Sequence, residues 1–252
     1  MLFRRHAENE AKPYRFADMH CHILPGMDDG SRDEKMSLEM LRIAASEGIT
    51  DMILTPHFIP GRAEPPKEVI CEETSKWNDI CREKGIPIRL YPGAEVFYTD
   101  AAVPVLERHL AETLNGTNRI LIEFPVTSDY LVILDAVKTV LGLGYVPVLA
   151  HIERYENLLG NKQDVYRLKD VGAELQVNAA TFTGHFGIRM KPFLRELLKE
   201  HLLDYIGTDA HNVEHRPPVV QKCLSELFTR FSKDKDYMEE ITFRNAKALM
   251  EA

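Results

Sequence analysis

Two histidines one residue apart, His20 and His22, follow a short apolar run and suggest a metal site. In a β-strand, alternate side chains point to the same face, so both imidazoles would be aimed at one point. A Leu-Pro-Gly turn at residues 24–26 returns the chain, and Asp28 and Asp29 then offer a carboxylate nearby. Imidazole nitrogen together with carboxylate oxygen suits zinc, manganese or iron. A strand whose histidines are merely polar and half exposed is the alternative, because His-x-His alone is a weak signal.

Further candidate ligands follow other short apolar segments of the chain. A histidine comes just after residues 51–55 and another directly after 146–150, while an Asp-Ala-His triplet follows 204–208. Glutamates stand at or near the ends of 86–91 and 119–124. Ten histidines placed at random would seldom fall at such positions. The predicted metal ligands are His20, His22, Asp29, His57, Glu95, Glu123, His151, Asp209 and His211.

The elements that must position these residues alternate between strand and helix. Strands are predicted for an opening segment that starts at Phe16 and for residues 51–55, 86–91, 119–124, 146–150, 173–178 and 204–208. Helices are predicted from a Ser31–Glu34 capping box to Gly48, at 67–84, around 103–110, from a Thr127–Ser128 cap to Gly142, and near 163–169, 194–203, 218–231 and 237–250.

Seven strand–helix repeats predict parallel strands with right-handed crossovers and helices outside. We therefore expect an α/β fold, a distorted (β/α)7 TIM-like barrel in a single domain. Residues 16–252 would form the barrel, and residues 1–15 a charged, flexible N-terminal extension. In such barrels the loops at the carboxyl ends of the strands converge, so the nine candidate ligands would meet there.

Nine imidazoles and carboxylates in one place would be unfavourable without cations, because like charges at short range repel. Two or three divalent metals, one carboxylate bridging, would satisfy them, and such a cluster suits in-line displacement at phosphorus. Arg154 and Arg216 lie in the loops after the fifth and seventh strands and could hold phosphate through paired hydrogen bonds. Surface salt bridges are the alternative role for both arginines.

Composition excludes several other classes of function. The chain has 252 residues, 44% of them apolar, and a formal charge of −8, which argues against a nucleic-acid partner. No apolar run is long enough for a membrane span and no secretory signal begins the chain, so we expect a cytoplasmic protein. The four cysteines lack both a C-x-x-C spacing and the Cys-x5-Arg loop of cysteine phosphatases. Their expected role is structural.

Six motifs, in this order and spacing, carry a resemblance to a known family: H-C-H-I-L-P-G-M-D-D-G, T-P-H, P-G-A-E, I-E-F, H-I-E-R-Y and G-T-D-A-H-N-x3-R-P-P. They resemble the polymerase-and-histidinol-phosphatase (PHP) superfamily. More narrowly, they are similar to the manganese-dependent protein tyrosine phosphatases encoded with bacterial capsule and exopolysaccharide systems. The resemblance extends from about Phe16 to Pro218.

The resemblance implies that the nine residues above are metal ligands, with Glu95 bridging, and that Arg154 and Arg216 bind phosphate. It implies two or three metals, with manganese expected first and iron or zinc as alternatives. The implied substrate is phosphotyrosine on the tail of a partner tyrosine autokinase that regulates polysaccharide synthesis. A phenol leaves more readily than an alkyl alcohol, so a site without an obvious strong acid could still expel it.

Three other functions stay open at this point. A phosphatase of the same superfamily could act on histidinol phosphate or another small phosphomonoester. An amidohydrolase also opens with His-x-His, but it would place a histidine where this chain has Asn178. A non-catalytic docking module would be expected to lack ligands, whereas every ligand position here is filled. The sequence leaves the metal, the protein substrate and homo-oligomer formation undetermined.

Overall fold

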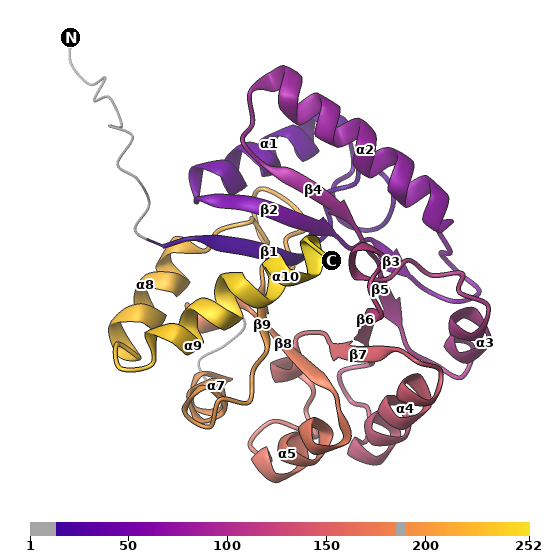
Figure 1. Ribbon diagram of the computed structural model, residues 1–252, viewed down its shortest axis with the longest axis vertical. Coiled ribbons are helices and arrows are strands. Elements are labelled where there is room, and N and C mark those ends of the chain that lie inside the picture. Colours follow the sequence, from indigo (N-terminus) through magenta and orange to yellow (C-terminus); the bar gives the residue numbers. More distant parts are fainter. Residues whose placement is uncertain (1–13, 185–189) are drawn as a thin grey trace.

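The computed structural model describes residues 14–184 and 190–252. Its parallel strands curl around a central axis, and the helices lie outside them (Figure 1). Two hydrogen-bonded sheets have the strand orders β1-β2-β4 and β3-β5-β6-β7-β8-β9. The strands are β1 Phe16–Cys21, β2 Ile49–Leu54, β3 His57–Phe58, β4 Arg89–Pro92, β5 Glu95–Phe97, β6 Arg119–Glu123, β7 Val146–Leu149, β8 Glu174–Asn178 and β9 Tyr205–Gly207.

These nine strands occupy the seven predicted positions. β3 continues β2 after two residues, and β5 continues β4 in the same way. The first and last strands also join, because the backbone N–H of Asp209 donates to the carbonyl of His20 and that of His22 donates to the carbonyl of Ala210, both at 2.8 Å. The predicted distorted (β/α)7 barrel is confirmed.

Most of the helices that cover the barrel lie near their predicted positions, but the helix predicted near 194–203 spans 190–199, and a short helix at 179–182 was not predicted. The helices are α1 Glu34–Ser46, α2 Lys67–Lys84, α3 Ala102–Glu107, α4 Tyr130–Gly142, α5 Lys162–Val171, α6 Ala179–Phe182, α7 Met190–Lys199, α8 Gln221–Arg230, α9 Lys235–Glu239 and α10 Asn245–Met250. Short 3₁₀ segments lie at Leu114–Gly116 and Ile152–Arg154. The α2 bounds are as predicted, and Gly85 ends that helix with φ 66°, a left-handed conformation that favours glycine.

Two predicted helix caps are wrong. Asp33, not Ser31, caps α1, and its side chain accepts a hydrogen bond from the N–H of Met36. Asp129, not Thr127 or Ser128, caps α4 in the same way. In both cases a carboxylate one or two residues further along the chain takes the position, where it also interacts favourably with the helix dipole.

The last predicted helix, residues 237–250, is interrupted. A π-helical turn, Glu240–Arg244, separates α9 from α10. Within it the hydroxyl of Thr242 donates to the carbonyl of Met238 at 2.6 Å. That side-chain hydrogen bond competes for an acceptor of the helix backbone, as threonine often does inside helices.

Apolar side chains fill the space between the sheet and the helices, in one large buried cluster. A smaller cluster joins the strands to α10 and includes Met19, Ile53, Val148 and Leu249. In Figure 1, α10 crosses in front of the barrel. No helix of the described residues combines the length and the apolar character needed to cross a bilayer.

The predicted N-terminal extension falls mostly on residues 1–13, which lie outside the described residues. Its last two residues pack on the barrel. The ring of Tyr14 stacks on Phe228 with centroids 4.4 Å apart, and Arg15 forms an ion pair with Glu239 at 3.1 Å. Those two residues therefore belong with the barrel.

Candidate metal centre

The structure brings all nine predicted ligand residues together at or just beyond the carboxyl ends of the strands. They come from β1, β3, β5 and β6 and from the segments that follow β1, β7 and β9. Donor atoms of seven of these residues fall into three overlapping groups that could each hold a cation, and His151 and Asp209 lie beside those groups. The nine residues are His20, His22, Asp29, His57, Glu95, Glu123, His151, Asp209 and His211.

The first group lies toward the rim of the barrel. His22, Asp29, His57 and His211 each offer one atom, and all four atoms lie within 4.8 Å of one another. Oδ1 of Asp29 is 3.4 Å from Nε2 of His57 and 3.6 Å from Nε2 of His211. Asp29 is exposed, whereas the imidazoles are largely buried, so the group opens to solvent on the carboxylate side.

The carboxylate of Glu95 is common to the other two groups. Its Oε1 lies 3.3 Å from Nε2 of His20, and its Oε2 lies 3.3 Å from Nε2 of His22. Oε2 is also 3.0 Å from Nδ1 of His57, which forms the third group with Glu95 and Glu123. Glu95 is fully buried at the centre of the cluster, where its two oxygens face different histidines.

His151 and Asp209 close the cluster on the remaining sides. Nε2 of His151 lies 3.1 Å from Oε1 of Glu95 and 3.3 Å from Oε1 of Glu123. Oδ1 of Asp209 lies 3.5 Å from Nε2 of His20 and 3.4 Å from Nε2 of His22. Both residues are almost completely buried.

The cluster strongly shifts the pKa values of His151, Glu95 and Asp209. Burial opposes protonation of His151, but the carboxylates of Glu123 and Glu95 outweigh it and raise the pKa of the imidazole to about 10. Burial likewise raises the pKa of Glu95, yet the surrounding histidines, His20 first, hold it well below its usual value. The pKa of Asp209 is lowered for the same reason. Glu95 and Asp209 are therefore held ionised, as carboxylates that bind cations must be.

The donor atoms are placed to coordinate a divalent cation rather than to form hydrogen bonds with one another. Oε2 of Glu95, Nδ1 of His57 and Nε2 of His211 are buried, yet they have no hydrogen-bond partner within the described part of the chain. Buried polar atoms are rarely left in that state. These atoms approach each other closely without hydrogen-bond alignment, which is expected of ligands arranged around a shared ion. Mixed nitrogen and oxygen donors suit manganese, iron or zinc.

Asp28 and Asp29, both considered from the sequence, have different positions. Asp29 faces the first group, whereas Asp28 lies behind it and accepts a hydrogen bond from Nδ1 of His22 at 2.7 Å. Oδ2 of Asp28 also accepts from the backbone N–H of His57 at 2.9 Å. The turn that allows this needs Gly30, because a Cβ there would lie 2.3 Å from the carbonyl oxygen of His22.

The two predicted phosphate-binding arginines lie beside the cluster. Nη2 of Arg216 contacts Oδ2 of Asp209, and Nη1 of Arg154 lies 3.7 Å from the same oxygen. About a quarter of each side chain is exposed, so both guanidinium groups reach the solvent side of the site. Asn212 folds the loop that carries Arg216, because its Oδ1 accepts from three successive backbone N–H groups, those of Glu214, His215 and Arg216.

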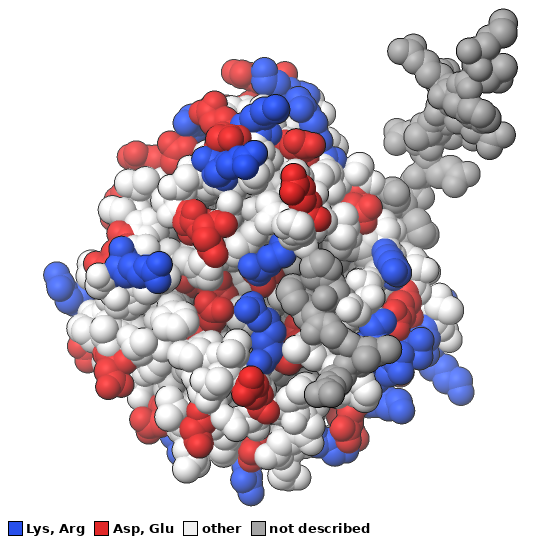
Figure 2. All heavy atoms as spheres, turned by 180° about the vertical axis from the view of Figure 1, so that it is seen from behind, with Lys and Arg blue, Asp and Glu red and all other residues white. Residues whose placement is uncertain are grey.

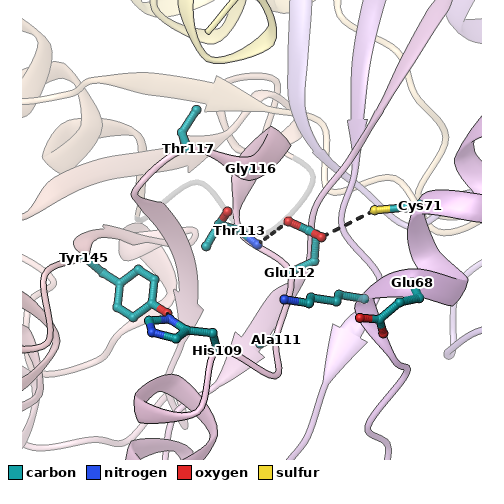
Figure 3. A pocket seen from close by; sticks show the side chains of 10 residues that line it. Glu68, Cys71, His109, Ala111, Glu112, Thr113, Gly116, Thr117 and Tyr145 are labelled. Atoms are coloured by element: carbon teal, nitrogen blue, oxygen red, sulfur yellow. Dashed lines mark hydrogen bonds between the residues drawn. The ribbon is translucent and has the colours of Figure 1, made fainter.

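The four cysteines lie outside this chemistry. Burial raises the pKa of the Cys71 and Cys81 thiols to about 11, and raises those of Cys21 and Cys223 further. Cys71 lines a separate hollow of about 460 Å³ between α2 and the segment after α3, where it contacts Glu112 (Figure 3). Four protonated thiols provide no nucleophile at neutral pH.

Charged side chains of both signs are mixed over the face opposite to the view of Figure 1 (Figure 2). Basic and acidic groups alternate there, and white surface separates them.

Comparisons with known proteins identify the family of this chain. Residues 16–251 match the family model described as "Capsular polysaccharide synthesis, CpsB/CapC". Tyrosine-protein phosphatase YwqE of Bacillus subtilis (strain 168) is 34% identical over 233 residues, which cover 90% of this chain and 91% of YwqE. Tyrosine-protein phosphatase CpsB of Streptococcus pneumoniae is 32% identical over 223 residues, which cover 86% of this chain and 92% of CpsB.

A solved structure has the same fold. It comes from the crystal structures of YwqE from Bacillus subtilis and CpsB from Streptococcus pneumoniae, described as unique metal-dependent tyrosine phosphatases. The match has a TM-score of 0.85 and 33% sequence identity, and it covers 93% of this chain and 94% of that one. The chain therefore belongs to the capsular polysaccharide synthesis CpsB/CapC family.

Proposed function

We propose that the nine clustered side chains hold two or three divalent cations. Manganese is the expected metal, and iron and zinc are the alternatives. The observation that supports this most directly is Glu95, whose two oxygens face separate histidines in two overlapping donor groups. One carboxylate at that position can serve two cations at once. The other eight residues supply the remaining protein ligands, and water would complete the coordination.

The chain is a metal-dependent tyrosine-protein phosphatase that does not use cysteine. The names of its relatives give the activity, and the protonated, mostly buried thiols of this chain agree with it. When bound, the cations would supply Lewis acidity at phosphorus and activate water as the nucleophile. Arg154 and Arg216 would bind the phosphate oxygens from the solvent side and orient the ester.

A tyrosine ester suits a site of this composition. Glu95 and Asp209 are held ionised, so neither is a ready proton donor for the leaving group. Phenol, with a pKa near 10, needs less protonation than an alkyl alcohol does. The relatives' names also favour phosphotyrosine over histidinol phosphate.

We infer that the physiological substrate is phosphotyrosine on the tail of a tyrosine autokinase that regulates capsular or extracellular polysaccharide synthesis. Family membership supports the polysaccharide context. An exposed tail can present its phosphate to a site at the rim of the barrel, where Asp29 and the two arginines meet solvent.

The deciding experiment compares three substrates with manganese added: a phosphotyrosine peptide, the matching phosphoserine peptide and histidinol phosphate. We expect turnover of the phosphotyrosine peptide to exceed that of the other two and to be abolished by a chelator. Readdition of manganese should restore it. Chelator-resistant turnover would contradict the metal-dependent mechanism, and preferred hydrolysis of histidinol phosphate would contradict the substrate assignment.

A further inference from the structure

Strand β8 supplies none of the nine ligands, yet it carries two amide side chains into the polar cluster. Gln176 and Asn178 are fully buried, and their two-residue spacing places them on one face of the strand. We propose that they are positioning residues: they form one hydrogen-bonded chain that fixes the tautomer of His20 and directs the carboxylate of Asp209. The inference rests on the proposed metal-ligand roles of His20 and Asp209.

The backbone N–H of His151 determines which atoms donate and which accept along this hydrogen-bonded chain. The N–H of His151 donates to Oε1 of Gln176 at 2.8 Å, and a backbone N–H can only donate. Oε1 is therefore the acceptor of that amide, and Nδ1 of His20, 3.1 Å from the same oxygen, must carry a hydrogen. The lone pair of His20 is then on Nε2, the nitrogen that faces Glu95 and Asp209. A second hydrogen bond that fixes the tautomer in this way is typical of metal-binding histidines.

The same direction continues to Asp209. Nε2 of Gln176 donates to Oδ1 of Asn178 at 3.0 Å, so the amide nitrogen of Asn178 is left to donate onward. It donates to Oδ2 of Asp209 at 2.8 Å. Oδ2 also receives Arg216, which leaves Oδ1 of Asp209 facing His20 and His22. The hydrogen bonds thus leave Nε2 of His20 and Oδ1 of Asp209 facing the cluster.

The backbone of β9 makes room for this chain. A Cβ at Gly207 would lie 2.8 Å from Cβ of His20 and 3.1 Å from Nε2 of Gln176. Any larger residue there would displace the histidine or the amide. The absence of a side chain on Gly207 lets His20, Gln176 and Asp209 approach across the joint between β1 and β9.

The test is a calorimetric titration of the metal-free protein with manganese, paired with its thermal unfolding. Gln176→Leu removes all three hydrogen bonds at similar volume, and we expect it to weaken manganese binding by about 10- to 100-fold. Asn78→Leu is the matched control, because Asn78 also bridges backbone groups, those of Thr74 and Leu90, outside the cluster. It should lower the unfolding temperature while leaving manganese affinity within about twofold of wild type. Equal manganese affinity of Gln176→Leu and wild type would overturn the inference.

Two charge-matched variants test the order of donors and acceptors along the hydrogen-bonded chain. They remain informative if Gln176→Leu does not fold. Gln176→Glu can still accept from His151 and His20 but can no longer donate to Asn178, so we expect it to restore only part of the affinity that Gln176→Leu loses. Asn178→Asp adds the same charge but cannot donate to Asp209, and it should bind manganese at least about 10-fold more weakly than Gln176→Glu. Equal affinities of the two variants would refute the proposed direction.

His20→Ala and Asp209→Ala separate this inference from the proposed function. Wild-type manganese affinity in both would refute the ligand assignment itself. Loss of affinity in these two, with wild-type affinity in Gln176→Leu and Asn178→Asp, would refute only the positioning role of β8.

Discussion

Asp28 accepts a hydrogen bond from Nδ1 of His22 at 2.7 Å, so the carboxylate lies behind the imidazole and outside the donor cluster. This leaves Nε2 of His22 to face Glu95 and Asp209. The same carboxylate accepts from the backbone N–H groups of His57 and Gly30. One side chain therefore orients His22, a proposed ligand, and also holds two loops of the site together.

Asp28→Asn should weaken manganese binding by about 10-fold, because the amide cannot accept from all three donors that the carboxylate satisfies. Manganese titration of the metal-free protein measures the effect. Asp33→Asn is the control: Asp33 caps α1 on the surface, and its replacement should leave metal affinity unchanged. Unchanged affinity in Asp28→Asn would show that His22 needs no such partner.

His151→Ala and Asp209→Ala should each lower metal content and abolish turnover of phosphotyrosine, because each removes a buried donor from the cluster. Metal per chain, measured by elemental analysis after gel filtration, and peptide turnover check the two effects together. His201→Ala, at an exposed histidine away from the cluster, should behave like wild type. Normal activity in either cluster variant would defeat the assignment.

Arg154→Ala should retain the metals and raise KM for the phosphopeptide, since Nη1 of Arg154 is 3.7 Å from the nearest carboxylate oxygen and free to bind phosphate. Arg216→Ala should also weaken metal binding, because Arg216 contacts Asp209 directly. Steady-state kinetics and metal content, measured on both variants, distinguish them. A normal KM in Arg154→Ala would remove this residue from the phosphate site.

Cys21→Ser should stay active. The thiol is buried and donates to the carbonyl of Ile53 at 3.3 Å, a contact that a serine hydroxyl can replace. Turnover of a phosphotyrosine peptide at saturating manganese is the measurement. An inactive variant with full metal content would point back to thiol chemistry.

Manganese affinity should rise with pH across the neutral range. In the metal-free protein the pKa of His151 is raised to about 10 and that of His22 lies well above its usual value, so both imidazoles hold protons at pH 7. A cation must displace those protons, and higher pH makes the displacement easier. Calorimetry in two buffers of unequal ionisation enthalpy counts the protons released. Affinity that is constant between pH 6 and 8 would contradict the protonation of these histidines.

The barrel, and the end of it at which the candidate ligands gather, could be predicted from the sequence alone. Strand–helix alternation and the end of each strand are local properties, visible in runs such as residues 146–150 followed by His151. The bounds of α2 were also predictable, because Gly85 marks its end. The caps of α1 and α4 were not, because several polar residues compete for each position and packing selects between them.

The residues that surround the proposed ligands could be identified only in the folded chain. Asp28 and Asp29 are adjacent and chemically identical, and their separate roles depend on the turn at Gly30 against His22. In the sequence, Gln176 and Asn178 are recognisable only as two amides on one face of a predicted strand. Their partners, His20 in β1 and Asp209 beyond β9, are 156 and 31 residues away along the chain. Hydrogen bonds between distant segments form only when the barrel closes, so the spacing of residues along the chain cannot reveal them.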